Sequence, residues 1–567
     1  MMRYTVFLAA AFTVLGQQQP AAPGGRGSGQ GGGAAPGRGA ASIRWEAWSA
    51  MRSSAATILG WPVGIAAEAV RQNTLFESLE KTDALGIANL ESSAAQKVNL
   101  EIPKPLGPQL LPGELTAVKD RLFALNVRMA AYRVPQIGSA EDNARKLFEF
   151  ARDIGIGVIV AERIPDTPPL IDKLANEYNA NVAVCGSPSA VLAAIASLSK
   201  KVGLCADASA LSVSSAAEVK DRLMVLRLSD TQASGLGSLL REMYRLEIKP
   251  ALLTVNATEP TLQGLEKVIH PLMAEQVMKM SRAAAIRGPD RLSAEERTAI
   301  DHALPQKAQV PAKKPRKLLV LDLNVAYPGH RSIPAENYGL EQMGKRTGAY
   351  EAVFNNDLDN LKYDRIKQFD AVFLNNTVGM IFVDPAVREG LTRFVREGGG
   401  LAGNHGVSHA SMDWPEFSEM IGVRRGVHRE PTEQAWVHIE DAHSPLTVPF
   451  GEKEFLYQDE FFRFPNPPYS RDKLHVLLTM DVMKTDMNQG RPCASPCVRA
   501  DADYAVSWIR NYGQGRVFFS ILGHNPTIFT TPALARYFLN GIQFILGDLD
   551  ADATPSARQA PRRASRR

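Results

Sequence analysis

Short apolar runs alternate with longer amphipathic stretches through residues 58–257. The runs are rich in aliphatic and β-branched residues, so each predicts a buried strand, while stretches such as 140–153 and 169–178 have the spacing of amphipathic helices. The predicted strands cover residues 63–67, 86–90, 128–132, 157–161, 182–185, 202–206, 223–228 and 252–255. Eight such units in about 200 residues predict a compact (β/α)8 TIM barrel, with its chemistry at the C-terminal ends of the strands.

A second alternation begins at the apolar run 318–323. Further strands are predicted at residues 352–355, 371–374, 400–403, 435–439, 454–457, 476–480, 505–509 and 516–521, and helices at 337–347, 385–397, 414–421 and 532–545. This order predicts an α/β domain with a doubly wound, flavodoxin-like sheet. In such a sheet, ligands bind beyond the carboxyl ends of the strands.

The N-terminal segment has the pattern of a secretory signal. Arg3 precedes the apolar run 4–15, which is too short for a membrane-spanning helix, and a Gly/Ala/Pro-rich stretch follows it. We therefore expect a periplasmic or secreted protein without a membrane span. The expected divisions are a signal peptide at 1–17, a tether at 18–44, the barrel at 45–285, a Pro- and Lys-rich linker at 286–316, the second domain at 317–548 and a disordered Arg-rich tail at 549–567.

The positive charge of the chain lies at its ends. The net charge of the 567 residues is +4, but residues 1–42 carry three arginines and residues 553–567 carry five, with no acid in either segment. Removing these eight charges leaves the rest of the chain at −4. A body of this charge is not typical of nucleic-acid binding, so we expect no nucleic-acid partner. A small uncharged sugar suits it better.

The four cysteines fall into two pairs. Cys493 and Cys497 lie in a loop-like run and are close enough to form a small disulfide in an oxidising compartment, whereas a zinc site there would need two further ligands at conventional spacing. Cys185 and Cys205 each lie at the end of an apolar run and are expected to be buried thiols.

The first domain resembles the xylose-isomerase-like TIM barrels, which include sugar phosphate isomerases and epimerases. The resemblance rests on the strand spacing and on Lys146-Leu-Phe-Glu-Phe150, Val158-Ile-Val-Ala-Glu162, Leu170-Ile-Asp-Lys-Leu-Ala175 and Val202-Gly-Leu-Cys-Ala-Asp207. The family holds a divalent metal with residues that follow strands five to eight. The corresponding residues here are Cys185, Asp207, Arg227 and Asn256. Only Asp207 suits a hard metal ion, so we expect a degenerate barrel that serves as a scaffold or substrate platform.

The second domain resembles the ThuA-like, or trehalose-utilisation, domains, which are relatives of class I glutamine amidotransferases. The resemblance covers about residues 316–548. It rests on Gly329-His-Arg-Ser-Ile-Pro334, Phe369-Asp-Ala-Val-Phe-Leu-Asn-Asn-Thr377, Gly398-Gly-Gly-Leu-Ala-Gly-Asn-His405, His443-Ser-Pro-Leu446, Asp459-Glu-Phe-Phe-Arg-Phe464, Val506-Ser-Trp-Ile-Arg-Asn-Tyr-Gly-Gln-Gly-Arg-Val-Phe518 and Leu522-Gly-His-Asn525.

The residues at the amidotransferase positions exclude glutamine hydrolysis. A glutaminase needs a Cys nucleophile at the strand-to-helix elbow, where this chain has His405. His524 occupies the position of the base, but Pro526 stands where an acid is expected. What remains is a cleft with two histidines and the Asp459-Glu460 pair, which suits proton transfer or a metal.

From these positions we expect His405, Glu460 and His524 to be catalytic, with Asp459 orienting them. The same three residues are the candidate ligands of a divalent metal, and Glu162 and Asp207 are vestigial candidates on the barrel rim. His443 is expected to be a turn residue, and His428 is expected to be packed or solvated. The expected substrate-binding residues are Asn376, Ser332, His330, His409 and Trp414.

The resemblance implies an exported protein of carbohydrate catabolism. We expect an isomerase, lyase or hydrolase acting on a sugar, keto-sugar or keto-glycoside, with the site in the second domain; the oligomeric state is open. One alternative is a non-catalytic carbohydrate-binding or scaffold protein with two degenerate enzyme folds. Another places activity in the barrel through Glu91, Glu162 and Asp207. It fails if these carboxylates point apart or form salt bridges with Arg133 or Arg227.

Overall fold

The structure, a computed structural model, describes residues 55–464, 467–488, 499 and 501–558. The expected signal peptide and tether, and the expected disulfide between Cys493 and Cys497, lie outside the described residues. Among the helices that are described, none is both long enough and apolar enough to cross a membrane.

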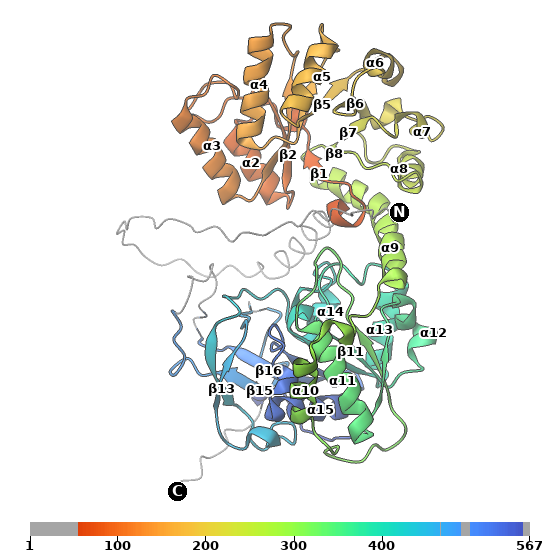
Figure 1. The fold of residues 1–567 in the computed structure, drawn as a ribbon, viewed down its shortest axis with the longest axis vertical. Helices are drawn as coiled ribbons and strands as arrows, with labels where there is room; N and C mark the ends of the chain where they lie inside the picture. The colour runs from red at the N-terminus through yellow and green to blue at the C-terminus, as the bar shows by residue number, and fades with distance from the viewer. Residues whose placement is uncertain (1–54, 465–466, 489–498, 500, 559–567) are drawn as a thin grey trace, which may run out of the picture.

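The first domain is a closed barrel of eight parallel strands, which confirms the predicted TIM barrel (Figure 1). Each strand pairs with the next along the chain, and β8 pairs with β1. The strands are β1 Val63–Ile65, β2 Asn89–Ser93, β3 Arg128–Val134, β4 Val158–Ala161, β5 Asn181–Cys185, β6 Val202–Asp207, β7 Leu223–Leu228 and β8 Leu252–Val255. Small and branched side chains, including Ala131, Val160, Ala183 and Val225, form a buried cluster on one face of these strands.

Helices surround the barrel because each presents one apolar face to the strands. In α4 (Glu141–Ile154), Leu147 and Phe148 are buried, and burial of each contributes roughly 1.5–3 kcal/mol. Gly155, at φ +81°, ends this helix in a left-handed conformation. The other helices are α2 Leu75–Ala84, α3 Pro112–Ala124, α5 Pro168–Glu177, α6 Pro188–Ile195, α7 Ala216–Val219 and α8 Leu236–Arg245.

The long helix α9 (Glu259–Ala283) runs from the barrel to the second domain (Figure 1). Near its end, Arg282 forms an ion pair with Asp359 at 2.7 Å. The segment expected as a linker is packed rather than free: α10 (Ala294–Ala303) lies against α11 (Ile333–Thr347), and the amide of Lys313 donates to Asp548.

The second domain is built on a nine-stranded sheet in the order β10-β9-β11-β12-β17-β16-β15-β13-β14. The first five strands in this order are parallel, and the remaining four pair antiparallel. The predicted doubly wound sheet therefore holds for the parallel half, whereas the other half is an antiparallel extension. The strands are β9 Lys317–Leu321, β10 Glu351–Phe354, β11 Ala371–Leu374, β12 Gly400–Asn404, β13 Gln434–Ile439, β14 Phe455–Gln458, β15 His475–Met480, β16 Ala505–Tyr512 and β17 Gly515–Ser520.

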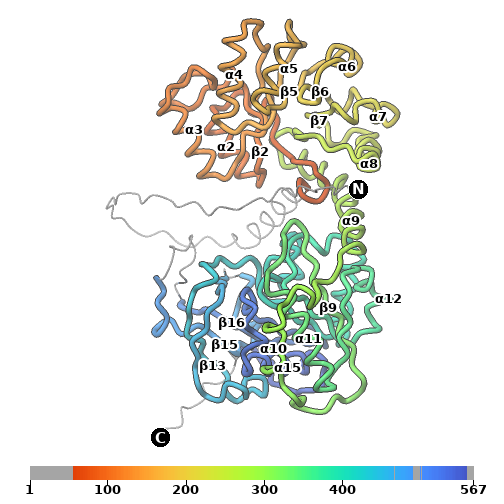
Figure 2. The backbone as a smooth tube through the Cα atoms, in the orientation of Figure 1, coloured from red at the N-terminus to blue at the C-terminus, as the bar shows by residue number. Residues whose placement is uncertain are grey.

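The remaining helices of the second domain are α12 Tyr363–Ile366, α13 Pro385–Arg396, α14 Pro415–Ile421 and α15 Pro532–Ile545. Figure 2 follows the same path as a tube, in which the stretch that includes β16 and α15 is blue. The ordered chain continues past the expected boundary at 548, because the amide of Ser556 donates to the carbonyl of Leu474 and Leu549 is buried. Of the expected tail, residues 559–567 lie outside the described part.

Candidate metal and catalytic site

Four side chains meet at one end of the second sheet. His330 follows β9, His405 follows β12, Glu460 follows β14 and His524 follows β17. One potential ligand atom from each of the four lies within 4.8 Å of the others. The carboxyl ends of β9, β12 and β17 point to the same edge of the sheet, which is why residues so distant in sequence come together.

His405 is held in a strained position directly after β12. Its φ is +38°, and its ring stacks on Phe462 with centroids 4.5 Å apart. Nδ1 lies 2.9 Å from the carbonyl of Ile521, which can only accept, so Nδ1 carries the proton. In the neutral ring, Nε2 then offers a lone pair, and it lies 3.3 Å from Oε2 of Glu460, another acceptor. Two facing acceptors call for a proton or a cation, and Nε2 has no hydrogen bond of its own.

His330 and His524 complete the group. The rings of His330 and His405 lie edge to face at 4.8 Å, and those of His330 and His524 at 5.2 Å. Burial, with the neighbouring His405 and His524, lowers the pKa of His330 to about 2, so this ring is neutral, as a ligand must be. The side-chain NH2 group of Asn525 donates to two backbone carbonyls, so the nitrogen and oxygen of this side chain are distinguished. Its Oδ1 then accepts from Nδ1 of His524 at 3.4 Å.

Glu460 connects the cluster to a half-exposed histidine. Its Oε1 lies 2.9 Å from Nδ1 of His428 and 4.0 Å from Nε2 of His524. Burial alone would raise the pKa of Glu460, but the neighbouring imidazoles of His405 and His428 hold it well below its ordinary value. Burial likewise opposes charge on His428, yet the bond to Glu460 raises the pKa of His428. Glu460 is therefore an anion that faces imidazoles.

Asp459 positions the loop that carries His524. Its carboxylate is fully buried and accepts from the amides of Gly523 at 2.8 Å, Asn525 at 3.0 Å and Glu460 at 3.0 Å. Burial raises the pKa of Asp459, although these three amides favour its charged form. The expected orienting role of Asp459 is in keeping with these contacts, since it ties the segment after β17 to the segment after β14.

A buried polar network lies beneath the same loop. Glu336 accepts from Asn376 at 2.9 Å and from Asn404 at 3.1 Å, and burial raises its pKa to about 8. Ser332 donates to the carbonyl of Gly523 at 2.6 Å. Gly523 has φ +126°, and a Cβ there would meet Asn404 at 2.4 Å. This network fixes the backbone on which His405 and His524 stand.

Several residues expected to bind substrate have their polar atoms engaged within the protein. Asn376 and Ser332 belong to the network beneath the loop and are fully buried. His409 hydrogen-bonds with Ser408 at 3.1 Å, and burial lowers its pKa to about 3. Trp414 is buried and stacks on Phe417 in the core, so it does not stack on a ligand.

Three residues around the cluster were not predicted from the sequence. His428 was expected to be packed or solvated, yet it binds Glu460. Tyr327, whose hydroxyl lies 3.4 Å from Nε2 of His330, and Glu336 had no expected role. The proximity of Tyr327 to His330 in the sequence was a usable signal, whereas nothing local marks Glu336 as buried.

His330 and His524 also line a cavity of about 780 Å³. The lining also includes Arg287, Arg291 and Glu296, which follow α9 in the chain, and Arg331 adds a third guanidinium. Arg287 is bound to the carbonyl of Asp322 at 2.6 Å. Arg291 and Arg331 are exposed. With three guanidiniums and one carboxylate, the lining carries a net positive charge, although the body of the chain is slightly acidic.

The mouth of the barrel does not assemble a hard-metal site from its candidate carboxylates. Glu91 is fully buried and accepts from Arg133 at 2.8 Å. Asp207 accepts from Ser209 at 2.7 Å and also from Ser229. Because Glu91 pairs with Arg133, the hypothesis that the barrel carboxylates are catalytic is not supported.

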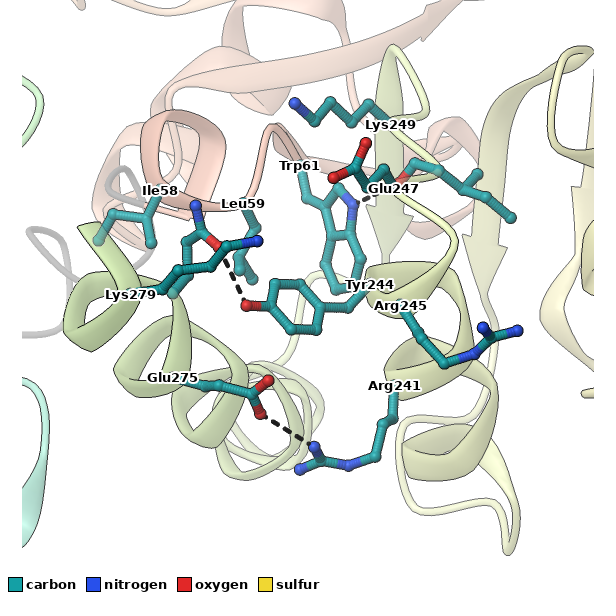
Figure 3. Close-up of a pocket in the computed structure, with 12 residues that line it drawn as sticks. Ile58, Leu59, Trp61, Arg241, Tyr244, Arg245, Glu247, Lys249, Glu275 and Lys279 are labelled. Atoms are coloured by element: carbon teal, nitrogen blue, oxygen red, sulfur yellow. Dashed lines mark hydrogen bonds and ion pairs between the residues drawn. The ribbon is translucent and has the colours of Figure 1, made fainter. Parts of the chain in front are cut away.

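Another cavity, of about 490 Å³, lies on the barrel near the segments that lead into β1 and β8 (Figure 3). Several of its polar groups bind one another: Trp61 donates to the carbonyl of Ile248 at 2.8 Å, and Tyr244 donates to Gln276 at 3.0 Å. TIM-barrel active sites form at the opposite, C-terminal ends of the strands, so this cavity is a poor candidate for catalysis.

Comparison with known protein families identifies the second domain. Residues 317–545 match the ThuA family, described as trehalose utilisation, so this part of the chain is a ThuA domain. No curated protein matches the chain.

Several solved structures resemble parts of the chain. An uncharacterised protein of Parabacteroides distasonis is 22% identical, with 37% of this chain and 98% of that chain covered and a TM-score of 0.33. A ThuA-like protein of Bacteroides uniformis is 18% identical, with coverage of 44% and 98% and a TM-score of 0.35. A xylose isomerase domain protein of Planctomyces limnophilus is 12% identical, with coverage of 39% and 97% and a TM-score of 0.29.

Proposed function

We propose that the ThuA domain is a divalent-metal-dependent enzyme that moves a proton next to the carbonyl of a sugar, keto-sugar or keto-glycoside, with isomerisation or elimination as the outcome. The observation that carries this proposal is the convergence of His330, His405, Glu460 and His524. The family description, trehalose utilisation, supports a role in carbohydrate metabolism.

The donor set fits a first-row transition metal. The three imidazoles, His330, His405 and His524, are borderline ligands that suit zinc and its neighbours better than magnesium or calcium, and they leave Glu460 to act on a proton. Nδ1 of His405 also donates a hydrogen bond to a backbone carbonyl. Such a bond orients the ring of a metal-bound histidine. When bound, such an ion would polarise a substrate carbonyl and stabilise the negative charge that follows removal of the neighbouring proton.

The side chains around the cluster suit the remaining tasks. Glu460 is the base or acid, and His428, which is 41% exposed, exchanges its proton with solvent. Tyr327 supplies a hydroxyl donor beside His330. Arg291 and Arg331 offer hydrogen bonds to hydroxyl, carbonyl or carboxylate oxygens of a substrate in the cavity.

Metal analysis and activity screening test this function together. The purified protein is analysed for metals, then assayed on keto-glycosides and simple disaccharides before and after chelation. His405→Ala is expected to lose metal and at least 100-fold of activity, by analogy with removal of an essential catalytic group. His443→Ala, at an exposed histidine, is the matched control. Unchanged metal content and product formation in His405→Ala would refute the assignment.

The alternative is a non-catalytic carbohydrate-binding or scaffold protein with two degenerate enzyme folds. The barrel favours it, because its mouth pairs Glu91 with Arg133 rather than leaving Glu91 for chemistry. Equilibrium binding of the same sugars to wild type and to His405→Ala separates the two functions. Metal-independent binding without turnover in either protein would favour the alternative.

We also propose that the protein is periplasmic or secreted, on the signal pattern of residues 1–17. N-terminal sequencing of the protein from fractionated cells tests this. A cytoplasmic protein that retains Met1 would contradict it.

A further inference from the structure

Two thiols lie side by side at the C-terminal mouth of the barrel. Cys185 ends β5, and Cys205 on β6 is its register partner. Neighbouring strands are about 4.8 Å apart, which lies within the Cα separation that a disulfide needs. Cys205 belongs to the buried cluster of the barrel and Cys185 packs against the same cluster, so their side chains share a face, and the two thiols hydrogen-bond with each other. In the structure both cysteines are free.

Positive charge surrounds the outer thiol. Arg227 on β7 donates to Sγ of Cys185 at 3.0 Å. Arg133 lies near on β3, and the two guanidiniums are partly balanced by Glu91 and Glu68. A guanidinium at this distance favours thiolate over thiol. In keeping with this, the hydrogen bond from Cys205, with the charges of Arg227 and Arg133, lowers the pKa of Cys185 to about 7 against the effect of burial.

The two thiols differ in access. Cys185 is half-buried, whereas Cys205 is only 2% exposed. Arg227 and Glu68 are also partly exposed, with 21% and 50% of their side chains accessible. A small reagent that enters the mouth therefore meets Cys185 first, with Cys205 directly behind it.

We propose that Cys185 and Cys205 form a thiol–disulfide exchange site that takes small disulfides as its substrates. The thiolate of Cys185 attacks one sulfur of a disulfide RSSR, forming a mixed disulfide and releasing RS⁻. Cys205 then gives up its proton to solvent, and its sulfur attacks Sγ of Cys185 and expels the second RS⁻. The protein dithiol is oxidised by two electrons, and RSSR is reduced to two thiols.

The second step is favoured by the loss of charge in the first. The hydrogen bond with Cys185, burial and the negative charge of Cys185 together raise the pKa of Cys205. Once Cys185 is in a mixed disulfide, that charge is gone, and Arg227 is left facing Cys205. Oxidised glutathione is a suitable probe because its carboxylates match the guanidiniums at the mouth.

The experiment uses the full chain with Cys493 and Cys497 both replaced by serine, so that two thiols remain. The reduced protein is treated with oxidised glutathione, and its intact mass and free thiols are followed over time. We expect loss of both thiols and two hydrogen masses, with no glutathione retained. Further replacement Cys205→Ser should trap one glutathione on Cys185.

Two further variants test the order and the charge. Cys185→Ser should slow the reaction of the remaining thiol at least about tenfold, because Cys205 is buried. Arg227→Gln should slow the first step about three- to tenfold, since a smaller thiolate fraction outweighs the gain in nucleophilicity. Circular dichroism of each variant shows whether it is folded.

Three outcomes would overturn the proposal. Retention of glutathione when both Cys185 and Cys205 are present would show that the second step does not occur. Equal rates for Cys185→Ser and Cys205→Ser would show that no thiol is activated. Reaction only after denaturation would show that the mouth is closed to disulfides.

Discussion

Replacement of Asp459 by asparagine tests whether this buried carboxylate positions the histidine cluster. The carboxylate accepts three backbone amides, with Oδ2 serving Gly523 and Oδ1 serving Asn525 and Glu460. Asparagine keeps one oxygen and replaces the other with an NH2 group, so at least one amide would face a donor. An unsatisfied buried group costs about 1–3 kcal/mol.

The loss of a hydrogen bond to this side chain should appear in two measurements. If the oxygen stays on the side of Asn525 and Glu460, one bond is lost, and we expect the free energy of unfolding to fall by about 2 kcal/mol in urea titrations. The loop carrying His524 loses its tie to the segment after β14, so metal affinity should fall about 10- to 100-fold, as for other residues that orient ligands. Metal affinity is measured by competition with a chromophoric chelator.

The control is Asp364→Asn, which makes the same chemical change at an exposed position in α12. It should leave both quantities unchanged, within about 0.5 kcal/mol for stability. Wild-type stability together with wild-type metal affinity in Asp459→Asn would refute the positioning role. A loss of stability without a loss of metal affinity would confine Asp459 to folding.

Three other substitutions probe the loop, the proton route and a pH-dependent contact. Gly523→Ala should destabilise by roughly 1–3 kcal/mol more than Gly398→Ala, because both glycines have positive φ but only the first has atoms within 4 Å of an added Cβ; equal unfolding midpoints would contradict this steric argument. His428→Gln should keep the metal but lower turnover about 10- to 100-fold, measured with the metal content of the same sample; unchanged turnover would remove it from the proton route. Burial opposes charge on His475, but its bond to Asp441 raises the pKa of His475. Its stabilising effect is therefore complete below the unfolded value of about 6.5 and is lost as pH rises through the higher folded pKa. Unfolding free energies measured from pH 6 to 9 should show this decline, and Asp441→Asn should reduce it; the same slope in both proteins would refute the assignment.

Local patterns were sufficient for most of the fold. The barrel strands were predicted to within a few residues because each is a short apolar run bounded by amphipathic helices, as β7 (Leu223–Leu228) and β8 (Leu252–Val255) illustrate. The helix α15 (Pro532–Ile545) begins at a proline and is almost wholly buried, so its limits were clear. The antiparallel half of the second sheet was not predicted, because an apolar run does not state the direction of its neighbours.

The sequence by itself determined the two domain types and three members of the cluster as candidate metal ligands, since His405, Glu460 and His524 follow strand-like runs in motifs of a resembling family. Only the tertiary structure decided which other residues join them. His330 is within ligand distance and His428 binds Glu460, although neither contact follows from spacing along the chain.

The tertiary structure also decided which polar residues face the cavity. Asn376 and Ser332 are more hydrophilic than Tyr327, yet they are buried beneath the loop, and Tyr327 lines the cavity. Which side chains are buried, and which groups they contact, depends on strands that are paired across more than a hundred residues, such as β12 and β17. The physical reason is that a sequence fixes the period and the polarity of each segment, whereas contacts between side chains depend on how distant segments pack.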